Sequence, residues 1–435
     1  MKSRRLFMIA MALFAVVASA LLVAAQEEGS IMTRDAEGHQ ITAWGWDTLE
    51  FNRPILDYLE EHSGVIVEDL VFPHDEIVQK LTVSAAAGGV GMPDVFKWTS
   101  TGIPRLVEMG AVMDITDLVA PYKDLLPEVA WDMVTYQGSI WGVPANSPAG
   151  GLFWRYDVAT EYGIDPNAIE TWDDFLAAAQ TIEGESGGAI AMLQMPSVGL
   201  PWPVNVTIQQ QHRAELIGSD LTVKIGPDSA EWLATLEDWR AVRDGITGVE
   251  MDQWTQPWYQ AIKDGSIAVF PSGTWFVETI KQQAPDSLGK WYFTPFPAVE
   301  PGGDRYPNFG SATCFITSAT DDPVAAMEWV KVWTMEPAST LEIGLNQLGI
   351  SVISKAALES PIVNAPHEYF AEDQAYWFDA TEAFAKSTYV PPVTKYDAEA
   401  SDIFNRYAEQ WWLGNITDQE FLQSVADELA ALVAE

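Results

Sequence analysis

A regular alternation of strand and helix signals near the N-terminal end constrains the fold of this chain most strongly. Residues 41–46, 65–72 and 93–98 are apolar or alternating segments that predict strands. Helical spacing of apolar residues fills the two intervals, over residues 52–63 and 77–87. Strands separated by single helices pair in parallel through right-handed crossovers. The pattern therefore predicts an α/β layer fold.

The same style continues toward the C-terminal end. Thr171 and Asp174 form a capping-box-like start to a helix that we expect to reach residue 182. Further strands are predicted at residues 221–225, 267–271 and 293–297, and further helices at 232–243, 323–335 and from 418 onward.

The chain is 435 residues long, which is more than a single hydrophobic core usually supports. We therefore expect two lobes. No low-complexity stretch, tandem repeat or Pro/Ser-rich segment separates them. Two lobes without a linker suggest that the chain crosses between them more than once, which makes a hinge with a ligand cleft.

Residues 1–25 have the order of a secretory signal peptide. A basic start is followed by the apolar run 6–23 and by the small residues Ala24 and Ala25. An uncleaved membrane anchor is the alternative, because about 18 apolar residues just suffice to span a bilayer. No cysteine lies near the expected cleavage site, so we expect a soluble periplasmic protein without a lipid anchor.

Charge and aromatic content narrow the range of partners. The formal net charge is −39, and such a field repels nucleic acid and anionic lipid headgroups. The acidic residues are spread along the chain, which is typical of a solvated acidic surface.

The 19 tryptophans are unusually many. Most belong to a core, but the excess also suits a site that stacks flat rings on sugar faces.

No constellation typical of an enzyme stands out in the sequence. The five histidines lack metal-ligand spacing, and no G-x-S-x-G motif occurs. Cys314 lies in an apolar strand-like run and is predicted to be buried and inert. We therefore expect no catalysis, metal or cofactor. A secreted glycoside hydrolase is the remote alternative, because 62 acidic residues could supply a carboxylate pair.

Several short motifs follow one another in a fixed order along the chain. They are GMPDV at 91–95, YQGSIWGVP at 136–144, LFWRYD at 152–157 and GSIAVFPSGTW at 265–275. In this order they resemble the extracellular solute-binding proteins of carbohydrate ABC importers (family 1), the family that includes maltose-binding protein. The resemblance implies a type II-like periplasmic-binding-protein fold: two α/β lobes joined by several crossover segments, with a ligand cleft between them.

The resemblance also implies lobe boundaries and a function. The first lobe would comprise residues 38–145 and 310–352, and the second 146–309 and 353–435. A monomer would bind a sugar or oligosaccharide and deliver it to the membrane permease. A polyamine, metal ion or phosphate ester is the alternative ligand. A cation binder needs a ring of acids in the cleft, whereas a sugar binder needs two or more aromatic faces there.

The candidate ligand-binding residues are those expected in cleft-facing loops. Aromatic rings stack on the C–H faces of sugars, and polar side chains hydrogen-bond the hydroxyl rim. By the resemblance, Trp98 and Trp275 match ligand-contacting tryptophans of the family, although core burial is the alternative for each tryptophan. The candidates are Trp46, Asp47, Trp98, Thr99, Ser100, Asn146, Ser147, Trp154, Trp202, Trp275, Asn308, Gly310, Tyr396 and Asp397.

Overall fold

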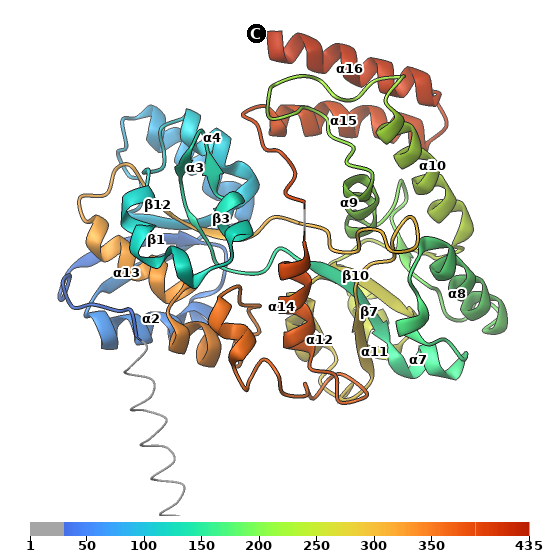
Figure 1. The fold of residues 1–435 in the computed structure, drawn as a ribbon, viewed down its shortest axis with the longest axis horizontal. Coiled ribbons are helices and arrows are strands. Elements are labelled where there is room, and N and C mark those ends of the chain that lie inside the picture. The colour runs from blue at the N-terminus through green and yellow to red at the C-terminus, as the bar shows by residue number, and fades with distance from the viewer. Residues whose placement is uncertain (1–29, 388, 435) are drawn as a thin grey trace, which may run out of the picture.

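Helices and strands are divided between two lobes that lie side by side (Figure 1). The structure is a computed structural model that describes residues 30–387 and 389–434. The predicted signal peptide, residues 1–25, lies outside the described residues. No helix within the described part of the chain is both long and apolar enough to cross a bilayer.

The first lobe is built on a five-stranded sheet with the order β2-β1-β3-β12-β6. Strands β1 (Gln40–Gly45), β2 (Ile66–Val71) and β3 (Val95–Thr99) pair in parallel, as the alternating pattern predicts. Strand β12 (Ala312–Ile316) runs antiparallel to β3 and to β6 (Val143–Pro144). Because β12 returns from much later in the chain, two separate stretches of sequence build this sheet.

Helix α2 (Leu49–Ser63) begins three residues before the predicted start at Asn52. Thr48 caps it by accepting a hydrogen bond from the amide of Phe51, a signal that the apolar pattern does not contain. The other elements of this lobe are α3 (His74–Ala86), η1 (Ser100–Gly102), α4 (Ile103–Glu108), α5 (Thr116–Val119), η2 (Ala120–Leu125), α6 (Glu128–Asp132), β4 (Thr135–Tyr136), β5 (Ser139–Ile140), α13 (Pro323–Thr334) and η4 (Ser339–Leu345).

The second lobe is built on a three-stranded sheet that is entirely antiparallel. Strand β7 (Gly150–Arg155) lies between β10 (Val269–Gly273) and β11 (Trp291–Thr294). The strand predicted at residues 221–225 is wrong. Leu221 has a φ of 61°, which breaks an extended run, and the segment keeps only an isolated antiparallel bridge between Val223 and Ile217.

Helices surround this sheet and extend to the C-terminal end (Figure 1). The remaining elements are α7 (Tyr156–Glu161), η3 (Pro166–Ala168), α8 (Trp172–Glu185), β8 (Gln194–Met195), α9 (Trp202–Gln211), α10 (Ala230–Gly245), β9 (Val249–Glu250), α11 (Gln256–Asp264), α12 (Phe276–Gln283), η5 (Lys355–Glu359), α14 (Tyr376–Lys386), α15 (Asp397–Trp412) and α16 (Asp418–Ala434).

The predicted capping box of α8 is confirmed and can be tested directly. The Thr171 hydroxyl accepts from the amide of Asp174, and the Asp174 carboxylate accepts from the amide of Thr171. Thr171→Ala is expected to lower the free energy of unfolding by about 1 kcal/mol, because the amide of Asp174 at the helix N-terminus loses its hydrogen-bond acceptor. Urea denaturation measures this loss. The control Thr181→Ala, at a partly exposed position of the same helix away from its cap, is expected to change the free energy of unfolding by under about 0.5 kcal/mol. Equal losses in the two variants would contradict a capping role.

Buried apolar residues form three clusters, and strand β7 shows why. One cluster packs the five-stranded sheet against α2 and α13. The other two cover opposite faces of the three-stranded sheet: Leu152 and Trp154 point into one, and Phe153 between them points into the other.

Cys314 is fully buried in the first cluster, and burial raises the pKa of its thiol to about 12, which keeps it protonated and unreactive.

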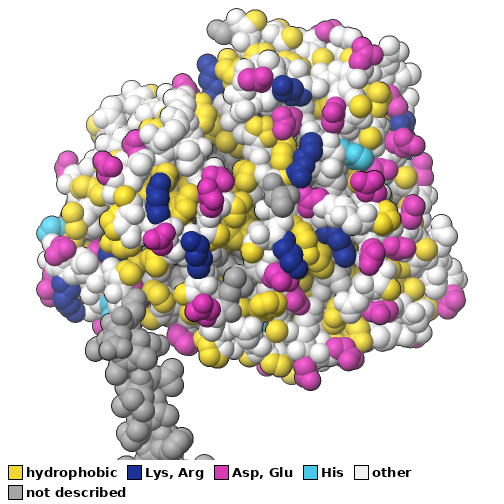
Figure 2. All heavy atoms as spheres, viewed as in Figure 1, with side chains coloured by type: hydrophobic (Ala, Val, Ile, Leu, Met, Phe, Trp, Pro, Cys, Tyr) yellow, Lys and Arg dark blue, Asp and Glu magenta, His cyan; other side chains and the backbone are white. Residues whose placement is uncertain are grey.

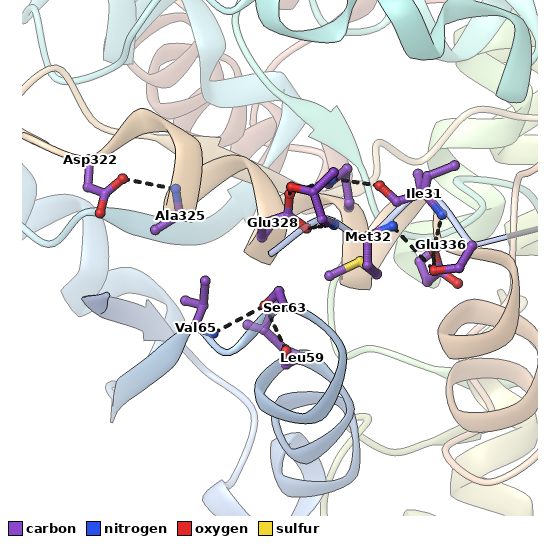
Figure 3. Close-up of polar contacts among 12 residues, drawn as sticks. Ile31, Met32, Leu59, Ser63, Val65, Asp322, Ala325, Glu328 and Glu336 are labelled. Atoms are coloured by element: carbon purple, nitrogen blue, oxygen red, sulfur yellow. Dashed lines mark hydrogen bonds and ion pairs between the residues drawn. The ribbon is translucent and has the colours of Figure 1, made fainter. Parts of the chain in front are cut away.

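A buried polar cluster fixes the start of the described chain to the first lobe (Figure 3). The amide of Ile31 donates to Glu336 over 2.8 Å, and both the amide and hydroxyl of Thr33 donate to Glu328. Lys331 lies 2.6 Å from Glu328 and also donates to the carbonyl of Ile31. Each buried charge of the cluster is therefore compensated by a neighbouring group, and removing one would leave another unpaired.

Candidate ligand-binding cleft

Two adjoining cavities lie between the lobes. The first, of about 470 Å³, is bounded by the end of β3 and the start of α4 on one side and by α9 and α15 on the other. The second, of about 590 Å³, lies between residues 132–137 of the first lobe and the segment 390–394. Both volumes fall within the roughly 300–1,000 Å³ typical of small-molecule sites. A notch between the lobes is visible at the upper edge of Figure 2.

The two cavities meet and form what we call the interlobe cleft. The residues common to both walls are Thr101, Asn308, Pro391, Pro392 and Thr394. They come from three separate stretches of the chain, so the meeting point is assembled only in the folded protein. A ligand at this point touches both cavities.

Aromatic side chains supply the apolar surface of the cleft. Trp98 from the first lobe and Trp202, Phe309 and Tyr389 from the opposite wall line the first cavity. The Trp202 ring is 49% exposed and packs on Phe309 with a centroid distance of 4.9 Å. Tyr136 lines the second cavity. More than two aromatic residues thus line the cleft, as a sugar site requires.

Local backbone geometry places Trp98 at the cleft wall. It lies near the end of β3, the edge at which parallel strands present ligand-binding groups. Its ring covers Gly102, where a Cβ atom would come within 1.8 Å of the ring, so only glycine fits there. The Trp98 Nε1 donor has no hydrogen-bond partner among the described residues.

The charged groups of the first cavity are mixed in sign. Arg105 and Lys395 line it together with Glu215 and Asp397. The hydroxyl of Tyr389 donates to Glu215 over 2.9 Å, and burial followed by this hydrogen bond raises the pKa of Tyr389. Burial also raises the pKa of Asp397, against the opposing hydrogen bonds from Thr394. The cavity therefore lacks the ring of acids that a cation site needs.

Seven of the fourteen predicted residues line the interlobe cleft. They are Trp98, Thr99, Ser100, Trp202, Asn308, Gly310 and Asp397. The fold brings them to one place from β3, α9, α15 and the segment near residue 310, and their ligand contacts stay predictions.

Asn146 and Ser147 line neither cavity. The side-chain oxygen of Asn146 accepts from the amide of Ala312 over 2.8 Å, and the amide of Ser147 donates to the carbonyl of Ser351 over 3.1 Å. These bonds join three stretches of the chain that are far apart in sequence. Ligand contacts of the two residues stay predictions.

The structure corrects the prediction for Trp154. Its ring is fully buried in the second lobe, and its Nε1 donates to the hydroxyl of Thr294 over 2.9 Å. The position lies inside a sheet covered on both faces, so no ring face is left for a ligand.

Four further candidates line neither cavity. Trp46 packs edge-on against His74, and Asp47 pairs with the buried ammonium of Lys97. Trp275 folds back over Gly273, and Tyr396 is half-buried at the start of α15. The ligand contacts of Trp46, Asp47, Trp275 and Tyr396 stay predictions.

Sequence reasoning missed several residues of the cleft. Arg105, Gln210, Glu215, Phe309 and Tyr389 all line the first cavity. Phe309 stands between two residues that were predicted, so its neighbours were the available signal. The other four residues lie on helices or loops, and the packing of the lobes decides which way their side chains point. No local sequence pattern identifies them as cleft residues.

Comparison with known proteins places the chain in a family. The sequence profile described as "Bacterial extracellular solute-binding protein" matches residues 45–338, more than half of the chain. The chain belongs to this family. This solute-binding protein is 22% identical to the arabinooligosaccharide-binding protein of Halalkalibacterium halodurans, over 71% of this chain and 73% of the relative. It is 23% identical to the lactose-binding protein of Rhizobium radiobacter, over 78% and 80%.

Solved structures share the fold of this solute-binding protein. The sugar-binding protein MalE from Xanthomonas citri aligns with a TM-score of 0.74 at 18% identity, covering 91% of this chain and 97% of the other. A binding protein from B. animalis subsp. lactis in complex with β-1,6-galactobiose aligns with a TM-score of 0.71 at 20% identity, covering 90% and 96%. The two-lobed architecture expected from the resemblance is confirmed by these likenesses.

Proposed function

We propose that this solute-binding protein is the sugar-binding component of an ABC importer and catalyses no reaction. The observation that carries the proposal is the interlobe cleft. There Trp98 and Trp202 line a cavity whose wall also contains positively and negatively charged side chains. Aromatic faces bind the apolar sides of sugar rings, and the polar edge suits hydroxyl groups. The names of the two relatives, which bind arabinooligosaccharide and lactose, support the same ligand class.

The location and partners of the protein form part of the proposal. Residues 1–25 would direct secretion, and the protein would act as a periplasmic monomer. Its lobes would close on the ligand, and the closed form would be recognised by the membrane permease. The lobe boundaries at 38–145 with 310–352 and 146–309 with 353–435 are proposed with it. The separate core clusters support most of this division, but Ala383 and Phe384 pack into the first cluster, and Leu345 and Val352 pack into the third.

The alternatives are weighed against the same cleft. A polyamine or metal-ion binder would need several unpaired carboxylates in the first cavity, which instead holds two acids and two bases. No group of three or more His, Cys, Asp or Glu able to hold a metal occurs in the described part of the chain. A glycoside hydrolase would need a carboxylate pair across a sugar, whereas the two acids of the first cavity, Glu215 and Asp397, accept hydrogen bonds from Tyr389 and Thr394.

A thermal-shift screen tests the proposed function. The purified protein would be heated with saturating glucose, maltose, maltotriose, galactose, lactose, raffinose, arabinose or arabinotriose, with spermidine and Ca²⁺ as controls. A ligand that binds only the folded state stabilises it by about 2.7 kcal/mol at a hundredfold excess over Kd. We expect a clear rise in Tm with at least one carbohydrate. A rise with spermidine or Ca²⁺ alone would keep the fold and overturn the ligand class.

A further inference from the structure

The backbone of Asn308 is held rigidly at the point where the two cavities meet. Gln210 of α9 donates from Nε2 to the Asn308 carbonyl over 2.7 Å, and its Oε1 accepts from the Asn308 amide over 2.8 Å. The Asn308 Oδ1 in turn accepts from the amide of Gly310 over 3.0 Å. Gly310 has a φ of 77°, a conformation that glycine adopts without strain. These contacts fix both the main chain and the amide plane of Asn308.

One polar atom of this arrangement remains unsatisfied. The Asn308 Nδ2 group is shielded from solvent and has no partner among the described residues, and the whole residue is 5% exposed. Leaving a buried donor unpaired costs free energy, so most buried polar groups in folded proteins are paired. Because Gln210 and Gly310 occupy every other polar group of Asn308, an acceptor from outside the chain is the partner that remains.

The position of Asn308 between the two cavities indicates the size of that ligand. The residue belongs to the walls of both cavities, and each cavity has its own aromatic residue, Trp202 in the first and Tyr136 in the second. Each cavity alone has the volume of a complete small-molecule site. A group that bonds Asn308 therefore lies between two compartments that can each hold a ring.

We propose that Asn308 determines specificity by donating from Nδ2 to an oxygen near the linkage between two sugar rings. The ligand class is then an oligosaccharide of two or more rings, with one ring in each cavity. In this proposal the two lobes move relative to each other and expose Nδ2, which is otherwise shielded from solvent. Gln210 is a positioning residue that holds Asn308 in place without touching the sugar. This inference rests on the proposed function, whose ligand it narrows.

The variant Asn308→Asp tests the donor alone. It keeps an oxygen for the amide of Gly310 and replaces Nδ2 by an acceptor of the same size. Isothermal titration would compare wild type and variant with glucose, maltose, maltotriose, galactose, lactose and raffinose. Asn167→Asp is the matched control, because Asn167 is exposed in the second lobe and lines neither cavity. Circular dichroism before titration checks folding, and Asn308→Ala replaces the first variant if that one does not fold.

The outcomes separate this inference from the proposed function. We expect wild type and the control to bind a di- or trisaccharide much more tightly than its monosaccharide, and Asn308→Asp to bind the oligosaccharide at least tenfold more weakly. Oligosaccharide affinity within twofold of wild type in both Asn308 variants would overturn the role of Asn308 and leave sugar binding intact. Equal wild-type affinity for monosaccharide and oligosaccharide would overturn the ligand class. Absence of any carbohydrate binding by wild type would overturn both proposals.

Discussion

Replacing Lys331 by methionine is expected to lower the free energy of unfolding by about 3–5 kcal/mol. The side chains of Lys331 and Glu328 are 1% and 3% exposed, and their charged atoms lie 2.6 Å apart. Methionine fills a similar volume but leaves the Glu328 carboxylate buried without its cation. It also removes the hydrogen bond from Lys331 to the carbonyl of Ile31. Urea denaturation followed by circular dichroism measures the loss.

A matched pair on another helix provides the control. Lys386 and Glu382 of α14 lie 2.8 Å apart, but their side chains are 46% and 41% exposed. Lys386→Met is expected to cost no more than about 1 kcal/mol, because solvent screens an exposed pair. The double variant Lys331→Met with Glu328→Gln is expected to be more stable than Lys331→Met alone, since no buried charge is left unpaired. If Lys331→Met and Lys386→Met lost the same stability, burial would not govern the cluster.

Trp202→Ala is expected to weaken carbohydrate binding at least 30-fold, which corresponds to about 2 kcal/mol. The Trp202 ring is half exposed on the wall of the first cavity, where it offers a flat apolar surface. Removing it takes away a stacking face and barely disturbs the core, because among the described residues only Phe309 is in ring contact with it. Isothermal titration with the carbohydrate that gives the largest thermal shift measures the loss.

Trp254 is the control for loss of an exposed indole. Its ring is 54% exposed, it packs on Trp258 and it lines neither cavity. Trp254→Ala is therefore expected to bind the carbohydrate with wild-type affinity. An unchanged affinity in Trp202→Ala would place the ligand away from the first cavity.

The sequence predicts several helices and strands well because their signals are local. Strands β1 and β3 end at Gly45 and Thr99, close to their predicted ends, and the capping box at Thr171 fixes the start of α8. Short apolar runs bounded by turn residues and caps need no tertiary information. The strand predicted at 221–225 fails for the same reason, because a run of branched residues favours extension although Leu221 adopts a positive φ.

The ligand-facing direction of side chains is not local and could be predicted only in part. Trp154 and Trp202 are both predicted from the sequence to contact a ligand, yet β7 is covered on both faces and the start of α9 faces the cleft. Arg105 and Glu215 line the same cavity only because the two lobes pack together. A single sequence carries no signal for such distant neighbours, which is why the prediction reached the right regions but not the complete wall.

Equilibrium dialysis of the purified protein against end-labelled oligosaccharides tests the central claim most directly. We expect saturable binding of one oligosaccharide per chain, with all of the label recovered afterwards in intact oligosaccharide. Release of shorter labelled products in proportion to protein and time would show turnover and contradict a binding protein. Failure to retain any of the oligosaccharides would contradict a carbohydrate site in the interlobe cleft.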